Sequence, residues 1–185
     1  MVALNGGQGL TIFFTGLSGA GKTTLAEALR DHLRAIDRRP VRLLDGDVLR
    51  RHLSPDLGFS REERDLHVRR VGYLASEITA CGAIALCAAI APYDLTRREV
   101  RALVEPVGTF RLVHVATPIE VCERRDVKGL YAKARSGQLT RFTGVSDPYE
   151  RPGDAEIVVN ATEVTVEEAC AQIEAELGAT GLIGA

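Results

Sequence analysis

Apolar and polar positions alternate along the chain in blocks that predict strands and helices in turn. The expected strands are short apolar runs at residues 11–15, 41–45, 83–90, 110–117 and 155–160. Segments with the apolar spacing of helices lie between or after them, at 22–37, 61–81, 95–105, 118–124 and 165–177. Strands and helices in alternation form parallel sheets that are covered on both faces. We therefore predict an α/β fold with a mostly parallel five-stranded sheet and helices on both of its faces.

Residues 126–152 interrupt this alternation. From residue 127 onward the segment shows no sustained period, carries glycines and several cations, and is longer than an ordinary connection. Long irregular segments in compact domains are commonly functional lids. A chain of 185 residues can form one domain with a substantial core, but not two comfortable ones. We expect one domain over residues 1–185, with a lid at about 126–152.

Composition narrows the class of protein. The 23 lysine and arginine residues nearly balance 25 acidic residues, so nucleic-acid binding driven by bulk charge is not expected. No apolar stretch is long enough to span a bilayer, and the N-terminal MVALNGGQG lacks the features of a signal peptide. The four cysteines show no metal-ligand spacing and are interpreted as buried thiols of a reducing compartment. These features predict a cytoplasmic protein without membrane contact.

A glycine-rich stretch, GLSGAGKTT, directly follows the first expected strand and opens the first helix. It fits the pattern GxxxxGK followed by Ser or Thr, in which backbone N–H groups surround phosphate oxygens at a helix N-terminus. Lys22 would lie near the β- and γ-phosphates, and the Thr23 hydroxyl would bind Mg²⁺. The alternative is a simple turn with a solvent-facing lysine; the complete match favours ATP binding. The predicted ATP-binding residues here are Gly16, Leu17, Ser18, Gly19, Ala20, Gly21, Lys22, Thr23 and Thr24.

Two carboxylates follow the second expected strand. Asp45 and Asp47 flank a glycine, and the ends of parallel strands are where ligands gather. One carboxylate can lie near magnesium while the other accepts a proton from an attacking hydroxyl. Asp47 alone could equally cap the helix that follows. Together with Lys22, the pair forms the predicted catalytic set.

Five strings in this order resemble adenylylsulfate kinases: FFTGLSGAGKTTLA, LLDGDVLR, LGFSREERDLHVRR, DVKGLYAKAR and FTGVSDPYE. The similarity runs from about residue 10 to the final helix. The P-loop is shared by many families, whereas the later four strings in this order are specific. The resemblance implies a P-loop kinase that transfers the γ-phosphoryl group of ATP to the 3′-hydroxyl of adenosine 5′-phosphosulfate. The products are then 3′-phosphoadenosine 5′-phosphosulfate and ADP, in sulfate activation.

The same resemblance implies an acceptor pocket. Arg50 and Arg64 match arginines that hold the phosphosulfate group, and Phe59 and Phe142 match aromatics on both sides of the acceptor adenine. Stacking favours a flat purine, and arginines suit a doubly anionic group. From the residues alone, Phe59 could be a core anchor and the arginines a solvated helix face. The substrate-binding residues implied are Asp47, Arg50, Phe59, Arg64, His67, Lys128 and Phe142.

In the lid, the resemblance places Lys128 near the acceptor and Arg125 against the ATP adenine. Closure of such a segment excludes water from the phosphoryl transfer. A charge-rich loop is otherwise usually just solvated.

Three positions depart from the family pattern. His67 stands where asparagine is frequent, and it is expected to donate to the acceptor and to titrate near neutrality. Ala91 replaces a frequent serine, which excludes a phosphoserine at that position. Asp94 stands where arginine is common, and the sequence leaves open whether Arg97 compensates.

Two other functions stay open at this point. The chain could phosphorylate a different small molecule, such as a sugar acid or shikimate, although the paired phenylalanines suit a base. It could also be a nucleotide-responsive module that regulates a sulfurylase without catalysis. The family resemblance further suggests a homodimer, possibly associated with or fused to ATP sulfurylase.

Overall fold

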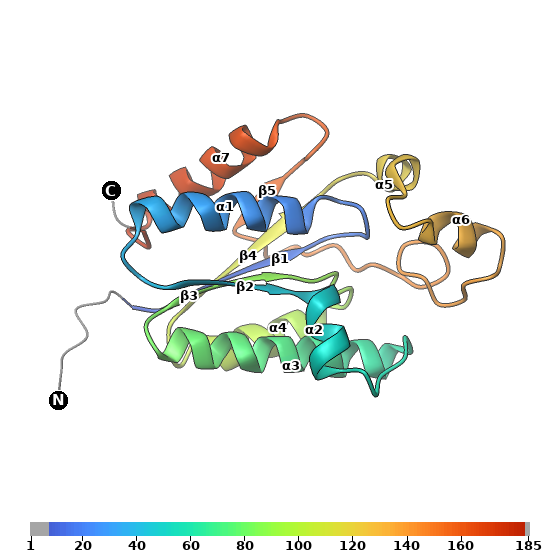
Figure 1. Cartoon of the computed structure of the whole chain (residues 1–185), viewed down its shortest axis with the longest axis horizontal. Helices are drawn as coiled ribbons and strands as arrows, with labels where there is room; N and C mark the ends of the chain where they lie inside the picture. The colour runs from blue at the N-terminus through green and yellow to red at the C-terminus, as the bar shows by residue number, and fades with distance from the viewer. Residues whose placement is uncertain (1–7, 184–185) are drawn as a thin grey trace.

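A computed structural model describes residues 8–183 (Figure 1). Its centre is a five-stranded parallel sheet in the order β2-β3-β1-β4-β5, which confirms the predicted α/β fold. The strands are β1 (Leu10–Thr15), β2 (Val41–Asp45), β3 (Ile84–Ala88), β4 (Thr109–Val115) and β5 (Ile157–Val159). The helices are α1 (Lys22–Ile36), α2 (Gly46–Leu53), α3 (Arg61–Ala80), α4 (Asp94–Val104), α5 (Ile119–Arg125), α6 (Leu130–Arg135) and α7 (Val166–Ala179). The ends of the predicted domain, 1–7 and 184–185, lie outside the described residues.

Helices cover both faces of the sheet, with α1 and α7 on one face and α3 and α4 on the other (Figure 1). Successive residues of β1 point to opposite faces because the side-chain period of a strand is two. Ile12 and Phe14 therefore pack with α1 and α7, while Phe13 packs with α3 and α4. All six residues of β1 are buried, so the strand that precedes the glycine-rich stretch is held rigidly in the middle of the sheet.

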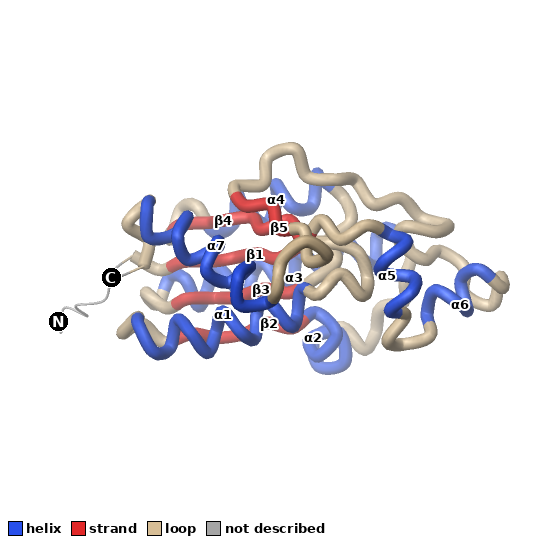
Figure 2. Tube along the Cα trace, turned by 90° about the horizontal axis from the view of Figure 1, so that it is seen from above, coloured by secondary structure: helices blue, strands red, loops and turns tan. Residues whose placement is uncertain are grey.

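Two helices are absent from the helical segments expected from the apolar spacing, although one of them, α2, is the helix that Asp47 was considered to cap. Helix α2 has eight residues, of which only Gly46 is buried, and α6 has six residues inside the predicted lid. Such short segments carry too few apolar positions to show a helical period. The predicted lid is thus partly helical. Helices α5 and α6 extend beyond the carboxyl ends of the strands (Figure 2).

Cysteine burial follows the prediction only in part. Cys87, Cys122 and Cys170 are buried free thiols, whereas Cys81 at the end of α3 is exposed. The expectation for Cys81 was therefore wrong, because the chain turns at the surface directly after α3. Within residues 8–183, no helix combines the length and apolarity needed to cross a bilayer.

Candidate active site at the carboxyl edge of the sheet

The glycine-rich stretch forms a tight loop between β1 and α1. Gly16 has φ +152°, and a Cβ there would lie 2.6 Å from the Val115 carbonyl oxygen. Gly21 has φ +106°, which residues with a side chain rarely adopt. The loop therefore requires glycine at these positions, and it delivers the chain to the N-terminus of α1, where unpaired N–H groups favour an anion.

Lys22 lies at the first position of α1 and is almost completely buried. Its ammonium donates a 2.7 Å hydrogen bond to the Leu17 carbonyl of the same loop. Burial lowers the pKa of Lys22 from 10.5 to about 8, and Asp47 partly opposes that shift. A buried cation without an anion in direct contact is poised to bind one.

Asp45 links the second strand to the glycine-rich loop. One of its carboxylate oxygens accepts a 2.7 Å hydrogen bond from the Thr23 hydroxyl. The other accepts from the N–H groups of Asp47 and Val48, at 2.9 Å each, and so caps α2. Asp45 therefore caps α2, and Asp47 does not.

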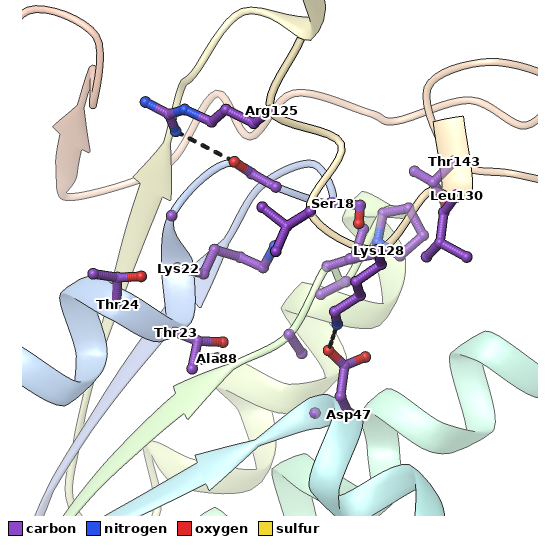
Figure 3. Close-up of a pocket in the computed structure, with 18 of the residues that line it drawn as sticks. Ser18, Lys22, Thr23, Thr24, Asp47, Ala88, Arg125, Lys128, Leu130 and Thr143 are labelled. Atoms are coloured by element: carbon purple, nitrogen blue, oxygen red, sulfur yellow. Dashed lines mark hydrogen bonds and ion pairs between the residues drawn. The ribbon is translucent and has the colours of Figure 1, made fainter. Parts of the chain in front are cut away.

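Asp47 reaches toward the lid. Its carboxylate forms an ion pair with Lys128, which comes from the loop before α6 (Figure 3). Both side chains are more than half exposed. The predicted lid and the start of α2 therefore meet across the cavity through these two charges.

A cavity of about 700 Å³ opens along this edge of the sheet. The end of β3 contributes the methyl group of Ala88 to the lining between the loop and Asp47 (Figure 3), and the next residue, Ala89, also lines the cavity; we call these two residues the alanine floor. Of the predicted site residues, the cavity brings together Ser18, Gly19, Gly21, Lys22, Thr23, Thr24, Asp47, Arg50, Phe59, Arg64, His67, Arg125, Lys128 and Phe142. The predicted site residues that do not line the cavity are Gly16, Leu17, Ala20 and Asp45.

Phe59 and Phe142 line the same end of the cavity but differ in exposure. The Phe59 side chain is 56% exposed, so it is not a core anchor. The Arg50 guanidinium lies 4.8 Å from the centre of its ring and donates to the Gly58 carbonyl at 2.8 Å. Phe142 is 8% exposed, and the centre of its ring lies 4.9 Å from the centre of the Tyr131 ring in an edge-to-face arrangement. One aromatic wall is therefore open and the other is fixed by packing.

Arg64 is buried rather than part of a solvated helix face. Each of its three guanidinium nitrogens donates to the protein. Nε donates to the Phe59 carbonyl at 2.9 Å, Nη1 to the Thr143 hydroxyl and Nη2 to the Arg141 carbonyl. Asp147 lies 3.4 Å from Nη2. Arg64 thus reaches the cavity with its hydrogen-bonding capacity largely used.

His67 is also buried, and protein groups occupy both of its ring nitrogens. Nδ1 lies 3.0 Å from the Ser54 hydroxyl and Nε2 lies 3.1 Å from the Gly46 carbonyl. Burial, followed by the charge of Arg50, lowers the pKa of His67 to about 4. The expectation that His67 titrates near neutrality was therefore wrong, because the fold removes its ring from water.

At the other end of the cavity, the end of α5 and the predicted lid both contact the glycine-rich loop. Arg125 donates to the carbonyls of Gly19 and Ala161, at 3.3 and 3.1 Å. Tyr131, which the sequence analysis did not single out, donates to the Ser18 carbonyl at 2.9 Å. In the sequence, the only indication of this contact was the presence of a tyrosine within the string DVKGLYAKAR.

The structure also shows the contacts made at the other two positions that depart from the family pattern, Ala91 and Asp94, and by Arg97. Arg97 is buried and donates to the carbonyls of Ala91 and Glu150, at 2.8 Å each, so it holds the loop after β3. Asp94 pairs with Arg98 at 2.8 Å on the surface of α4. Ala91 lines the cavity with a methyl group and has a positive φ of 43°.

The side chains beside the phosphate loop suit Mg²⁺. The ion keeps several water ligands and takes one or two groups from the protein together with substrate phosphates. The Thr23 hydroxyl and the Asp45 carboxylate, 2.7 Å apart beside the phosphate loop, fit that chemistry. Among residues 8–183 no cluster of three or more His, Cys, Asp or Glu could hold an ion without such phosphates.

Comparison with known proteins places the chain in one family. The family pattern described as adenylylsulphate kinase matches residues 8–160. An adenylyl-sulfate kinase of Synechococcus sp. (strain JA-3-3Ab) is 52% identical over 163 residues, covering 88% of this chain and 90% of that protein. A sulfate adenylyltransferase of Gibberella zeae is 46% identical over 176 residues, covering 95% of this chain but 31% of that protein.

A solved structure agrees with these relatives. The Mycobacterium tuberculosis APS kinase CysC, in complex with AMPPNP and APS, superposes with a TM-score of 0.87 and 37% identity. The match covers 92% of this chain and 98% of that one. The five sequence strings, the parallel sheet with its phosphate loop and these matches agree. The chain belongs to the adenylylsulfate kinase family.

Proposed function

We propose that this protein transfers the γ-phosphoryl group of ATP to the 3′-hydroxyl of adenosine 5′-phosphosulfate, giving 3′-phosphoadenosine 5′-phosphosulfate and ADP. The observation that carries the proposal is the single cavity shared by the phosphate loop, Asp47 and the pair Phe59 and Phe142. Membership of the adenylylsulfate kinase family supports the same reaction.

Phosphoryl transfer of this kind is driven by positioning and electrostatics. The loop amides and Lys22 stabilise charge on the transferring group once the ammonium turns from the Leu17 carbonyl toward phosphate. Asp47 orients or deprotonates the 3′-hydroxyl, and release of Lys128 from its ion pair frees the carboxylate for that task. Asp45 supports the reaction through Thr23 and through the start of α2.

Mg²⁺ would be held by the Thr23 hydroxyl, with Asp45 next to it. It supplies positive charge that neutralises the phosphate oxygens. Because the Thr23 hydroxyl donates its proton to Asp45, the lone pairs of its oxygen would be available to the ion.

In the acceptor pocket, the adenine ring lies between Phe59 and Phe142. Arg50 and Lys128 supply positive charge for the phosphosulfate, and at the donor end Arg125 lies against the ATP adenine. His67 lines the cavity but uses both ring nitrogens on protein groups, the Ser54 hydroxyl and the carbonyl of Gly46, which precedes Asp47 in the chain. Ala91 offers no hydroxyl, so we expect direct in-line transfer without a phosphoserine there.

The assembly proposed is a homodimer, with association with or fusion to a sulfurylase as a further possibility. The fungal sulfate adenylyltransferase matched here is about three times as long as the matched region. That length is compatible with an additional domain in the relative. Sedimentation of the purified chain measures the dimer directly.

Incubation of the protein with Mg-ATP and adenosine 5′-phosphosulfate tests the reaction. The expected product is the 3′-phosphorylated nucleotide, separated from ADP by ion-exchange chromatography. Transfer to gluconate or shikimate instead would indicate a different small-molecule kinase. Nucleotide binding without transfer to any acceptor would indicate a regulatory module.

A further inference from the structure

We propose that Tyr131 is a positioning residue that serves both nucleotide sites with the two ends of one side chain: its hydroxyl holds the phosphate loop, and its ring supports Phe142. The inference deepens the proposed function. The part that concerns Phe142 rests on it, because that ring is assigned to the acceptor adenine. Within residues 8–183, the lining of the main cavity does not include Tyr131, so it acts through its neighbours rather than by touching a substrate.

Tyr131 lies near the start of α6, where the fold fixes its backbone. The Asp126 carboxylate accepts from the N–H groups of Tyr131 and Ala132, at 2.9 and 3.0 Å. The Asp126 carbonyl accepts from the Gly129 N–H at 2.8 Å, which closes the turn between α5 and α6. The Tyr131 side chain is only 3% exposed. Burial raises the pKa of its hydroxyl, so this group remains a donor at neutral pH.

The hydroxyl belongs to a set of donors that hold the phosphate loop. Four consecutive carbonyls of the loop each accept a hydrogen bond from a side chain, and only one of the four donors belongs to the loop itself. The pairs are Lys22 with Leu17 at 2.7 Å, Tyr131 with Ser18 at 2.9 Å, Arg125 with Gly19 at 3.3 Å and Thr117 with Ala20 at 2.8 Å. Because the Lys22 ammonium turns to phosphate in the proposed reaction, the three outside donors are the ones that remain on the carbonyls.

A carbonyl that is held in this way also orients the N–H group that follows it. In a trans peptide, the carbonyl of one residue and the N–H of the next point in opposite directions. The Ser18 carbonyl is turned to Tyr131, so the Gly19 N–H points away from Tyr131. In the part of the chain that the structure describes, the Gly19 and Gly21 N–H groups have no protein acceptor. The loop therefore keeps backbone donors for phosphate oxygens.

The ring of Tyr131 lies against Phe142, which belongs to a later part of the predicted lid. The two ring centres are 4.9 Å apart and the ring planes meet at 85°, an edge-to-face geometry that stabilises aromatic pairs. Phe142 lines the main cavity in front of this contact. Loss of the Tyr131 ring should therefore disturb the acceptor wall, whereas loss of the hydroxyl alone should not.

Two substitutions separate the hydroxyl from the ring. Tyr131→Phe removes only the hydroxyl, and Tyr131→Leu removes the ring as well. Calorimetry with inorganic tripolyphosphate and Mg²⁺ measures the phosphate loop without any base. Kinetics at saturating ATP measures the KM for adenosine 5′-phosphosulfate. Tyr73→Phe, at an exposed position of α3, is the matched control and should leave both constants unchanged.

Tyr131→Phe should raise the dissociation constant of tripolyphosphate by about 2- to 10-fold, the size expected for one lost hydrogen bond, and leave the KM at its wild-type value. Tyr131→Leu should show the same loss for tripolyphosphate and also raise the KM by about 2- to 10-fold, as expected for a lost aromatic pair. The proposal is overturned by an unchanged tripolyphosphate constant in Tyr131→Phe, or by a KM that does not differ between the two variants.

Further variants keep the test open if the ring cannot be removed. Urea unfolding shows whether each protein folds, and Tyr131→Met, with a flexible apolar side chain, takes the place of an unfolded Tyr131→Leu with the same expected constants. Thr117→Val removes the donor to the Ala20 carbonyl with almost no change of shape. It should raise the tripolyphosphate constant and leave the KM unchanged. A wild-type tripolyphosphate constant in Thr117→Val would show that held carbonyls do not prepare the loop.

Failure of this inference is distinguishable from failure of the proposed function. If the wild-type protein forms no 3′-phosphorylated product, the proposed function fails, and the task assigned to the Tyr131 ring fails with it. The task of the hydroxyl is still measured, because tripolyphosphate binding needs no acceptor. Equal tripolyphosphate affinity of wild type and Tyr131→Phe would then overturn that task as well.

Discussion

Lys128 of the predicted lid forms an ion pair with Asp47 in the first turn of α2, across the cavity (Figure 3). The proposed catalytic carboxylate is thus neutralised by the residue that is proposed to hold the acceptor. An incoming phosphosulfate competes with Asp47 for the same ammonium, because both are anions. Acceptor binding and release of Asp47 are therefore coupled.

Lys128→Met should raise the KM for adenosine 5′-phosphosulfate by about tenfold or more, the size of effect expected when a hydrogen bond to a charged group is lost. Steady-state kinetics at saturating ATP measures the change. Lys133→Met, in the exposed part of α6, is the matched control and should leave the KM unchanged. Equal constants for wild type and Lys128→Met would remove Lys128 from the acceptor site.

Asp47→Asn should lower kcat by about 100-fold or more, in the range for loss of general-base catalysis, with ATP affinity nearly unchanged. Asp45→Ala is the contrasting variant. It should weaken ATP binding through Thr23 and destabilise the fold by about 1 kcal/mol, the usual value of a helix cap. Kinetics, ATP titration and urea unfolding separate these effects. Wild-type turnover in Asp47→Asn would exclude that residue from the chemistry.

Lys22→Ala should nearly abolish transfer. The lowered pKa of Lys22, about 8, adds a prediction for the wild type. ATP phosphates favour the protonated amine, so ATP binding just above that pKa takes up a proton, and affinity falls as pH rises through about 8. Calorimetry at about pH 8.5 in buffers of different ionisation enthalpy detects the uptake. Lys22→Ala should lose it, and equal uptake in both proteins would contradict the assignment.

His67→Asn should leave the pH profile of activity unchanged between about pH 6 and 8, since His67 is neutral there. Its effect should appear in stability. The unfolded chain binds a proton near the usual pKa of 6.5, but the folded chain does so only near 4. Stability therefore falls as pH decreases through this window, by up to roughly 1.4 kcal/mol per pH unit for one such proton.

Urea unfolding at a series of pH values checks that prediction. His67→Asn should flatten the slope between 6.5 and about 4, while exposed His52→Asn should keep the wild-type slope. His114, whose pKa burial also lowers to about 4, keeps its own contribution in both variants. A slope in His67→Asn equal to or steeper than that of the wild type would show that the buried ring is not the source.

Gly72 and Gly178 offer a matched test of packing between helices. A Cβ at Gly72 in α3 would lie 2.6 Å from a methyl group of Val100 in α4, whereas a Cβ at Gly178 in α7 meets nothing within 4 Å. Gly72→Ala should destabilise the fold by about 1–3 kcal/mol. Gly178→Ala should stabilise it by about 0.5–1 kcal/mol through helix propensity. Denaturant midpoints measure both, and a stable Gly72→Ala would contradict the close packing.

Sequence reasoning predicted the sheet well because its strands are nearly continuous apolar runs. The phosphate loop was equally accessible, since Gly16 and Gly21 are needed for local backbone conformation. The acceptor end was harder. Arg64 contacts Arg141 and Thr143, 77 and 79 residues away, and such partners depend on how the lid folds over α3. The family resemblance located Arg64 in the site but could not indicate which groups it serves.

His67 illustrates the other limit. A histidine in a helix is usually expected to titrate in its ordinary range. Its pKa depends on burial by the loop at Ser54 and the turn at Gly46, and neither can be inferred from spacing in the sequence. The pKa of His67 therefore depends on tertiary structure. The sequence motif alone, in contrast, was sufficient to predict that Lys22 and Thr23 line the cavity.

The alanine floor at Ala88 and Ala89 limits which residue can stand at position 46. Gly46 packs against it, with a hypothetical Cβ only 3.0 Å from the Ala88 carbonyl oxygen and 3.2 Å from the Ala89 methyl. A side chain at position 46 would therefore push the start of α2 away from β3 and displace Asp45 and Asp47, which flank this glycine. The closeness of these two carboxylates to the phosphate loop thus depends on one glycine and two alanines that carry no functional group of their own.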